Sequence, residues 1–121
     1  MRVRTTRDHI RAFIIGARGY NLVDIKRFYP REYEDRRATV ELAKSLDPET
    51  STREDVQSLW NLSGWDGVYN PGQRCDNCGQ CREAVVEVGE EPDYESNTAS
   101  MCEECLEAAL ALLRASKEGK A

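Results

Sequence analysis

Apolar residues in the first half of the chain recur every three or four positions, the spacing that places them on one face of a helix. The first such segment carries Ile10, Phe13, Ile14 and Ala17 after polar residues 5–9 that can cap it, and Gly19 interrupts it. Three further segments show the same spacing: Leu22, Ile25 and Phe28; then Tyr33, Val40, Ala43 and Leu46; then Val56, Leu59, Trp60 and Leu62. The pattern predicts four helices.

The boundaries of these helices carry their own signals. Asn21 can cap the second helix, and Pro30 starts or bends the third. Residues 47–50 (Asp-Pro-Glu-Thr) predict a turn, and residues 51–54 (Ser-Thr-Arg-Glu) are a capping-box signature for the fourth helix.

The pattern changes after residue 62. Residues 63–74 are rich in glycine, asparagine and proline and predict a linker, residues 82–88 predict a strand, and residues 106–113 predict a helix. We therefore expect an α+β protein that is mainly helical, with a helical domain at 1–62, a linker at 63–74 and a small module with a β-hairpin and a helix at 75–121.

Four of the five cysteines form two pairs with two-residue spacers, Cys75 with Cys78 and Cys102 with Cys105. Such pairs converge on one ion at about 2.3 Å, and four thiolates are a preferred ligand set for tetrahedral zinc. Gly79 after the first pair allows a tight turn with positive φ, and the second pair leads directly into the predicted helix. We predict one structural zinc ion.

The fifth cysteine leaves the register of the first pair open, because Cys78 and Cys81 have the same spacing as Cys75 and Cys78. We favour Cys75 and Cys78, since Cys81 then begins the predicted strand and can pack there as a small apolar group. The alternatives to zinc are an iron–sulfur cluster and a redox dithiol. The former lacks a fourth cysteine followed by proline, and the latter leaves one pair unexplained.

The order of ligand pair, strand, turn, strand and ligand pair at a helix start resembles a treble-clef zinc finger. Residues 75–116 are similar to modules in the zinc-binding domain of the Clp unfoldase and in small bacterial and phage proteins, which implies a fold rather than a function. The chain departs from them in the polar segment Gly89–Asn97, which we expect to be an enlarged hairpin loop.

Charge is distributed unevenly. Residues 1–37 contain ten Lys and Arg against five Asp and Glu, so the net charge of −5 for the whole chain leaves −10 for the remainder. From Cys75 to Glu107 there are ten acidic residues and a single base, Arg82, which disfavours binding to phosphates. We therefore expect a protein partner, bound through Glu90, Glu91, Tyr94 and Glu95; a merely solvated acidic surface is the alternative.

A nucleic-acid partner is the main alternative to a protein. Ile14, Gly19, Ile25 and Phe28 match the spacing of a helix-turn-helix unit, although Arg18 stands where such units bury a small residue. The candidate nucleic-acid contacts are Asn21, Lys26, Arg27 and Arg31. Asp24, which lies between them in the sequence, would repel phosphate.

Catalysis has little support in the sequence. His9 is the only histidine, and four cysteines close the shell of a zinc ion, whereas hydrolytic sites keep one position for water. An undetected enzyme is the third alternative. No segment reaches the roughly 20 apolar residues of a membrane span, and the odd cysteine count favours a reducing cytoplasm. The expected function is that of a small non-enzymatic zinc-binding regulator or adaptor, of phage or bacterial type; the oligomeric state does not follow from the sequence.

Overall fold

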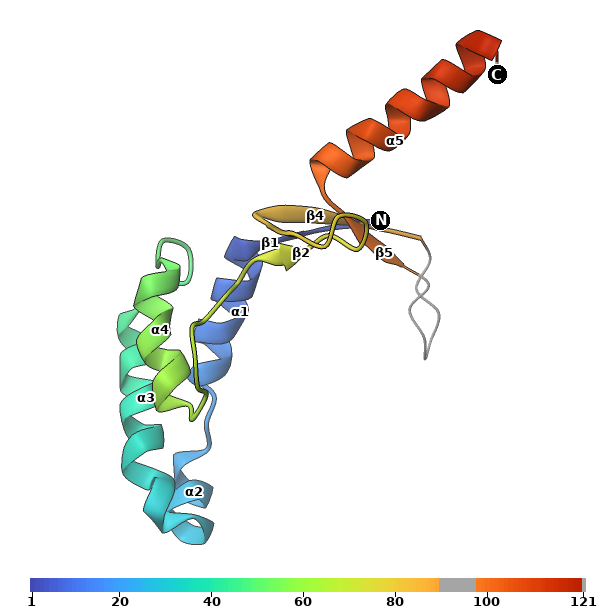
Figure 1. Ribbon diagram of the computed structural model, residues 1–121. Coiled ribbons are helices and arrows are strands. Elements are labelled where there is room, and N and C mark those ends of the chain that lie inside the picture. The colour runs from blue at the N-terminus through green and yellow to red at the C-terminus, as the bar shows by residue number, and fades with distance from the viewer. Residues whose placement is uncertain (90–97, 121) are drawn as a thin grey trace. The chain divides into compact units, whose positions relative to one another are not determined.

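The computed structural model describes residues 1–89 and 98–120. The chain forms two compact units (Figure 1): Arg7–Pro71 make a helical unit, whereas Met1–Thr6 and Gly72–Ala121 together make a second one. Helices and short antiparallel strands make up the described part of the chain, so the predicted α+β class with mainly helical content is confirmed.

The helical unit contains the four predicted helices. Helix α1 spans Thr6–Ala17, α2 spans Leu22–Phe28, α3 spans Tyr33–Ser45 and α4 spans Arg53–Leu62, with a 3₁₀ turn η1 at Pro30–Glu32 before α3. The predicted turn at residues 47–50 is closed by a hydrogen bond from the Ser51 amide to the Asp47 carbonyl at 2.9 Å. Helical periodicity in the sequence therefore located all four α-helices of this unit, because each helix buries or half-buries the apolar residues along one side.

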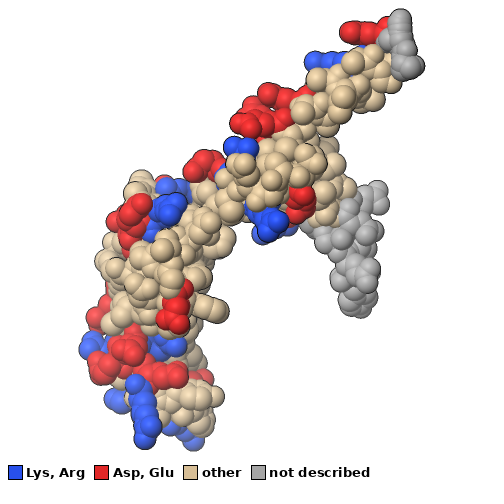
Figure 2. Space-filling view, in the orientation of Figure 1, with Lys and Arg blue, Asp and Glu red and all other residues tan. Residues whose placement is uncertain are grey.

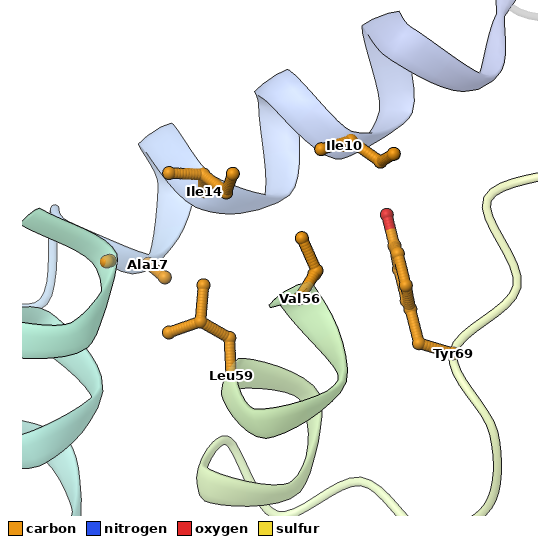
Figure 3. Packing of buried hydrophobic residues seen from close by; sticks show 7 residues of the cluster. Ile10, Ile14, Ala17, Val56, Leu59 and Tyr69 are labelled. Carbon is orange, nitrogen blue, oxygen red and sulfur yellow. The ribbon is translucent and has the colours of Figure 1, made fainter. Parts of the chain in front are cut away.

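The core of the helical unit lies between α1, α3 and α4. Figure 3 shows Ile10, Ile14 and Ala17 pointing from α1 toward Val56 and Leu59 of α4. Ile14, Val56 and Leu59 are fully buried, as is Ala43 of α3. These are residues of the predicted apolar stripes, so the hydrophobic pattern identified the packing faces.

Tyr69 joins this core from the segment that the sequence predicted to be a linker. It is 1% exposed, and its ring lies 5.3 Å from that of Phe13 and 5.4 Å from that of Trp60, measured between centroids. Its hydroxyl shares a hydrogen bond of 2.6 Å with Nδ1 of His9, and burial raises the pKa of Tyr69 to about 12. The single histidine therefore satisfies a buried hydroxyl.

Helix α4 begins one residue later than its predicted capping box. Thr52, rather than Ser51, is the N-cap: its hydroxyl accepts from the Asp55 amide at 3.2 Å, and the Asp55 carboxylate accepts from the Thr52 amide at 2.8 Å. Ser51 is buried, and its carbonyl accepts a hydrogen bond from Arg7. The capping-box pattern fits the sequence both at residues 51–54 and at residues 52–55. Because Ser51 is buried, Thr52 is the residue that caps the helix.

The second unit is built on a three-stranded antiparallel sheet in the order β1-β4-β5. Its strands are β1 at Arg2–Thr5, β4 at Ala84–Val88 and β5 at Ala99–Met101. A two-stranded ladder pairs β2, Gln73–Arg74, with β3, Cys81–Arg82. Helix α5 follows at Glu103–Ala115 and continues into a π-helical segment, η2, at Ser116–Lys120. Strand β4 and helix α5 correspond to the predicted strand and helix.

Strand β1 was not predicted, because its four residues contain one apolar side chain and the following residues begin a helix. It pairs with β4 so that Val3 lies opposite Val86. Arg2 and Arg4 form ion pairs with Glu87 at 2.9 and 2.8 Å. Burial raises the pKa of Glu87, but the hydrogen bonds from Arg4 and Arg2 outweigh it and hold that pKa below its ordinary value. The start of the chain thus belongs to the second unit.

Candidate metal centre

The first cysteine pair lies on a tight turn between β2 and β3. The Gly79 amide donates to the Cys75 carbonyl at 2.8 Å, and the Cys75 amide donates to the Gln80 carbonyl at 2.9 Å. Gly79 has φ of +75°, a conformation that side chains disfavour. The turn points backbone N–H groups at sulfur, since the amide of Cys78 bonds the Cys75 thiol and the amide of Gln80 bonds the Cys78 thiol.

The second pair lies at the start of α5. Cys102 is the N-cap residue, and its carbonyl accepts from the Leu106 amide at 3.0 Å, so Cys105 lies in the first turn. The Cys102 amide also donates to Sγ of Cys75 at 3.3 Å. A helix N-terminus presents free amides and the positive end of its dipole, both of which favour thiolate.

Asp76 joins the two pairs through β5. Its amide donates to the Ser100 carbonyl at 2.7 Å, and its carboxylate accepts from the Ser100 amide at the same distance. Because Ser100 lies two residues before Cys102, this reciprocal contact fixes the turn of the first pair against the strand that leads to the second.

The sulfur atoms of Cys75, Cys78, Cys102 and Cys105 all lie within 4.8 Å of one another, and those of Cys78 and Cys102 are 3.9 Å apart. Tetrahedral zinc with Zn–S bonds of about 2.3 Å separates its sulfurs by about 3.8 Å. The four cysteines are therefore placed to bind one metal ion. Cys81 is exposed in β3 opposite Arg74 and is not part of this cluster.

The thiols differ in how readily they ionise. The amides of Cys78 and Cys102 lower the pKa of Cys75 to about 6, and the Gln80 amide lowers the pKa of Cys78. Cys105 receives a hydrogen bond from Asn77, which lowers its pKa, but the neighbouring sulfurs, Cys102 first, and burial outweigh this and raise it to about 11. Four negative sulfurs at such distances repel one another, and a divalent cation removes that repulsion.

Two polar side chains contact the cysteines, and no pattern in the sequence predicted these contacts. Asn77 donates from Nδ2 to Sγ of Cys105 at 3.2 Å. The Arg82 guanidinium lies beside Cys78, whose hydrogen bond raises the pKa of Arg82, and it forms an ion pair with Glu104 at 3.0 Å. Such outer contacts orient ligands and offset their negative charge.

The predicted partner-binding residues Glu90, Glu91, Tyr94 and Glu95 lie outside the described residues. Their role stays a prediction.

The candidate nucleic-acid contacts are described individually. Asn21 caps α2 by accepting from the Asp24 amide at 3.2 Å. Lys26 lies over the Tyr33 ring at 5.3 Å and Arg27 over the Phe28 ring at 5.1 Å, and Arg31 is exposed in η1.

The packing between α1 and α2 that the helix-turn-helix alternative requires is not present. Helix α2 has no buried residue, and Phe28, which the pattern placed against α1, is 61% exposed. Arg18 donates instead to the carbonyls of Ala43 and Leu46, at 3.1 and 2.8 Å, and so satisfies the end of α3. The side chain of Arg18, just after α1, therefore links the end of α1 to the end of α3.

Comparisons of the chain with protein-family models, with curated proteins and with solved structures gave no match. The resemblance to treble-clef modules therefore depends on the cysteine spacing and the element order alone. Across residues 1–89 and 98–120, none of the helices combines the length and the apolar character needed to cross a membrane.

Proposed function

We propose that this protein is a non-enzymatic zinc protein. One structural zinc ion stabilises a treble-clef-like module, and this module binds another macromolecule, for which a protein is our first choice. The observation that carries the proposal is the convergence of four cysteine sulfurs from a turn and a helix start, within 4.8 Å.

Zinc is the metal that this ligand set favours. Four thiolates are soft ligands, and their arrangement around one point fits a tetrahedral ion. Zinc is such an ion, and it has no redox chemistry. Backbone amides directed at Cys75 and Cys78 stabilise the ionised ligands that zinc requires.

A structural role is supported by the size of the core around the site. The buried cluster of the second unit consists of Cys75, Val85 and Cys102, with Cys105 packed against it. So few apolar side chains supply little hydrophobic stabilisation, and metal binding provides folding free energy in modules of this kind. Bound by four cysteines, the ion would have no position left for a substrate or a reactive water.

The charge of the two units favours a protein partner over a nucleic acid. Around the cysteines, Asp76, Glu83, Glu103, Glu104 and Glu107 are exposed. On the face of the helical unit that Figure 2 shows, acidic and basic side chains are interspersed. Phosphate binding depends on clustered cations, which neither the acidic surroundings of the cysteines nor this face of the helical unit presents.

The metal assignment is tested by elemental analysis of the full-length protein produced with zinc. We expect one zinc ion per chain, loss of zinc in Cys78→Ser and full retention in the matched control Cys81→Ser. Replacement by cobalt(II) should give the visible absorption of a tetrahedral thiolate complex. Retention of zinc by Cys78→Ser together with its loss from Cys81→Ser would contradict this ligand set.

The partner class is tested with the zinc-loaded protein and fluorescent random duplex DNA at low and physiological salt. We expect little binding at physiological salt. For an identified protein partner, reversal of Glu90, Glu91 and Glu95 to lysine should slow association while zinc content stays at one ion. Tight, salt-dependent DNA binding that Lys26→Ala or Arg27→Ala weakens would assign recognition to the helical unit.

A further inference from the structure

Helix α5 carries a stripe of leucines with no partner in the described part of the chain. Leu106, Leu110 and Leu113 follow one another at spacings of four and three residues, the a/d spacing of paired helices. Leu110 is 43% exposed, Leu113 is 54% exposed and α5 has no buried residue. An isolated helix of this length is marginally stable in water, so a packing partner would stabilise α5.

The stripe continues into an apolar groove at the base of the helix. This groove, of about 330 Å³, lies between α5 and the sheet and is lined mainly by Val3, Val86, Met101, Leu106 and Leu110. Val3 is 58% exposed on the adjacent edge strand. Contiguous apolar surface of this kind, bordered by charged residues, is typical of an interaction site.

Charged residues along one edge of the leucine stripe change sign from one end to the other. Glu103 and Glu107 border its first half and Arg114 borders its second half on the same edge, whereas Lys117, four residues after Leu113, continues the line of the stripe; all four are exposed. Figure 2 shows charged atoms along one side of α5 and uncharged atoms along the other. In a parallel pair, this edge would face the opposite edge of the partner helix, where Cys105, Ala109 and Ser116 carry no opposite charge. With an antiparallel copy, the same edges of the two helices face each other, and Glu107 of each would meet Arg114 of the other.

We propose that α5 and its groove form the interface of a homodimer, in which two copies of α5 pack antiparallel about a two-fold axis near Leu110. Leu113 of each copy then lies beside Leu106 and the groove of the other, and the same edge of each helix supplies both charges of the ion pairs. The interface is self-complementary, as two-fold symmetry requires. It is built from residues other than the metal ligands, and it goes beyond the binding function proposed above.

The size of this surface sets the expected affinity. Stable interfaces bury at least about 1,200 Å² in total, and two short helices alone bury less, so the two grooves must contribute. We therefore expect dissociation in roughly the micromolar range rather than a permanent dimer.

Sedimentation velocity of the zinc-loaded, full-length protein over a concentration series tests the stripe. Leu113→Glu should remove the dimer, weakening association at least tenfold. Leu112→Glu is the matched control, because Leu112 is 74% exposed in the same helix but lies off the stripe, and it should leave association unchanged. Helicity and zinc content verify that each variant is folded. A wild-type monomer at every concentration, or equal effects of the two variants, would overturn the proposal.

A charge exchange distinguishes the antiparallel homodimer from any other association. Glu107→Arg places two arginines opposite each other at both symmetric positions, and Arg114→Glu places two glutamates there, so each should weaken self-association several-fold. The double variant in one chain should restore it, and an equimolar mixture of the two single variants should form a heterodimer. Failure of both the double variant and the mixture to recover association would exclude this pairing.

Discussion

Gly79 allows the backbone conformation of the turn that carries the first cysteine pair. Its backbone adopts φ of +75°, and the amide of the following residue, Gln80, is directed toward the sulfur of Cys78. A Cβ atom at this position would lie 3.7 Å from the Arg74 guanidinium, an ordinary contact. Any cost of a side chain at residue 79 therefore comes from the backbone conformation and not from a clash.

We predict that Gly79→Ala weakens metal affinity about five- to thirtyfold, the equivalent of the roughly 1–2 kcal/mol that an L-residue loses in the left-handed region. Gly79→Asn should cost less, since asparagine tolerates this conformation better. Competition with a chromophoric chelator measures both. Equal affinities for wild type and Gly79→Ala would show that the turn adopts another conformation.

Helix ends in this chain are stabilised by side chains that hydrogen-bond to backbone groups without a partner inside the helix. Thr52 and Asp55 exchange hydrogen bonds at the start of α4, and Arg18 satisfies carbonyls at the end of α3. Helix α5 instead begins at a cysteine of the metal cluster, with no side-chain cap bond. The position of α5 therefore depends on the cluster more than on capping.

We predict that Thr52→Ala lowers the free energy of unfolding of the helical unit by about 1 kcal/mol, because it leaves the Asp55 amide without its acceptor. Thr50→Ala, at an exposed residue two positions earlier, is the control and should change it by less than about 0.5 kcal/mol. Urea denaturation followed by tryptophan fluorescence is suitable, since both tryptophans, Trp60 and Trp65, belong to this unit. Equal midpoints for the two variants would contradict the observed cap.

At the scale of the whole molecule, the two units differ in what stabilises them. The helical unit buries Ile10, Ile14, Val56, Leu59 and Tyr69 in one apolar core. The second unit buries two cysteines and Val85. We therefore expect its stability to depend on a bound metal far more than that of the helical unit does.

Removal of the metal with a strong chelator should unfold the second unit and leave the helical unit folded. Hydrogen exchange with mass spectrometry should show that amides in residues 73–88 and 99–115 lose protection by at least about tenfold while those in residues 10–62 keep theirs. Tryptophan fluorescence should hardly change. Restoring zinc should restore protection. Simultaneous loss in both units would mean that they fold as one cooperative body.

The sequence by itself determined the helices of the first unit and the four cysteines of the cluster. Helical periodicity reports directly which side of a segment is buried, and a two-residue spacer fixes the distance between two sulfurs within a pair. Both are local properties, so Ile14, Leu59, Cys75 and Cys78 could be assigned their roles from neighbouring residues alone.

Only the tertiary structure decided the features that join distant segments. Strand β1 pairs with β4 across 79 to 85 residues, and Tyr69 packs on α1 from a segment without periodicity. The turn between β2 and β3 brings Arg82 beside Cys78. The convergence of the two cysteine pairs likewise depends on Asp76 and Ser100. Such contacts arise from sheet register and packing, which no local pattern of hydrophobic and polar residues encodes.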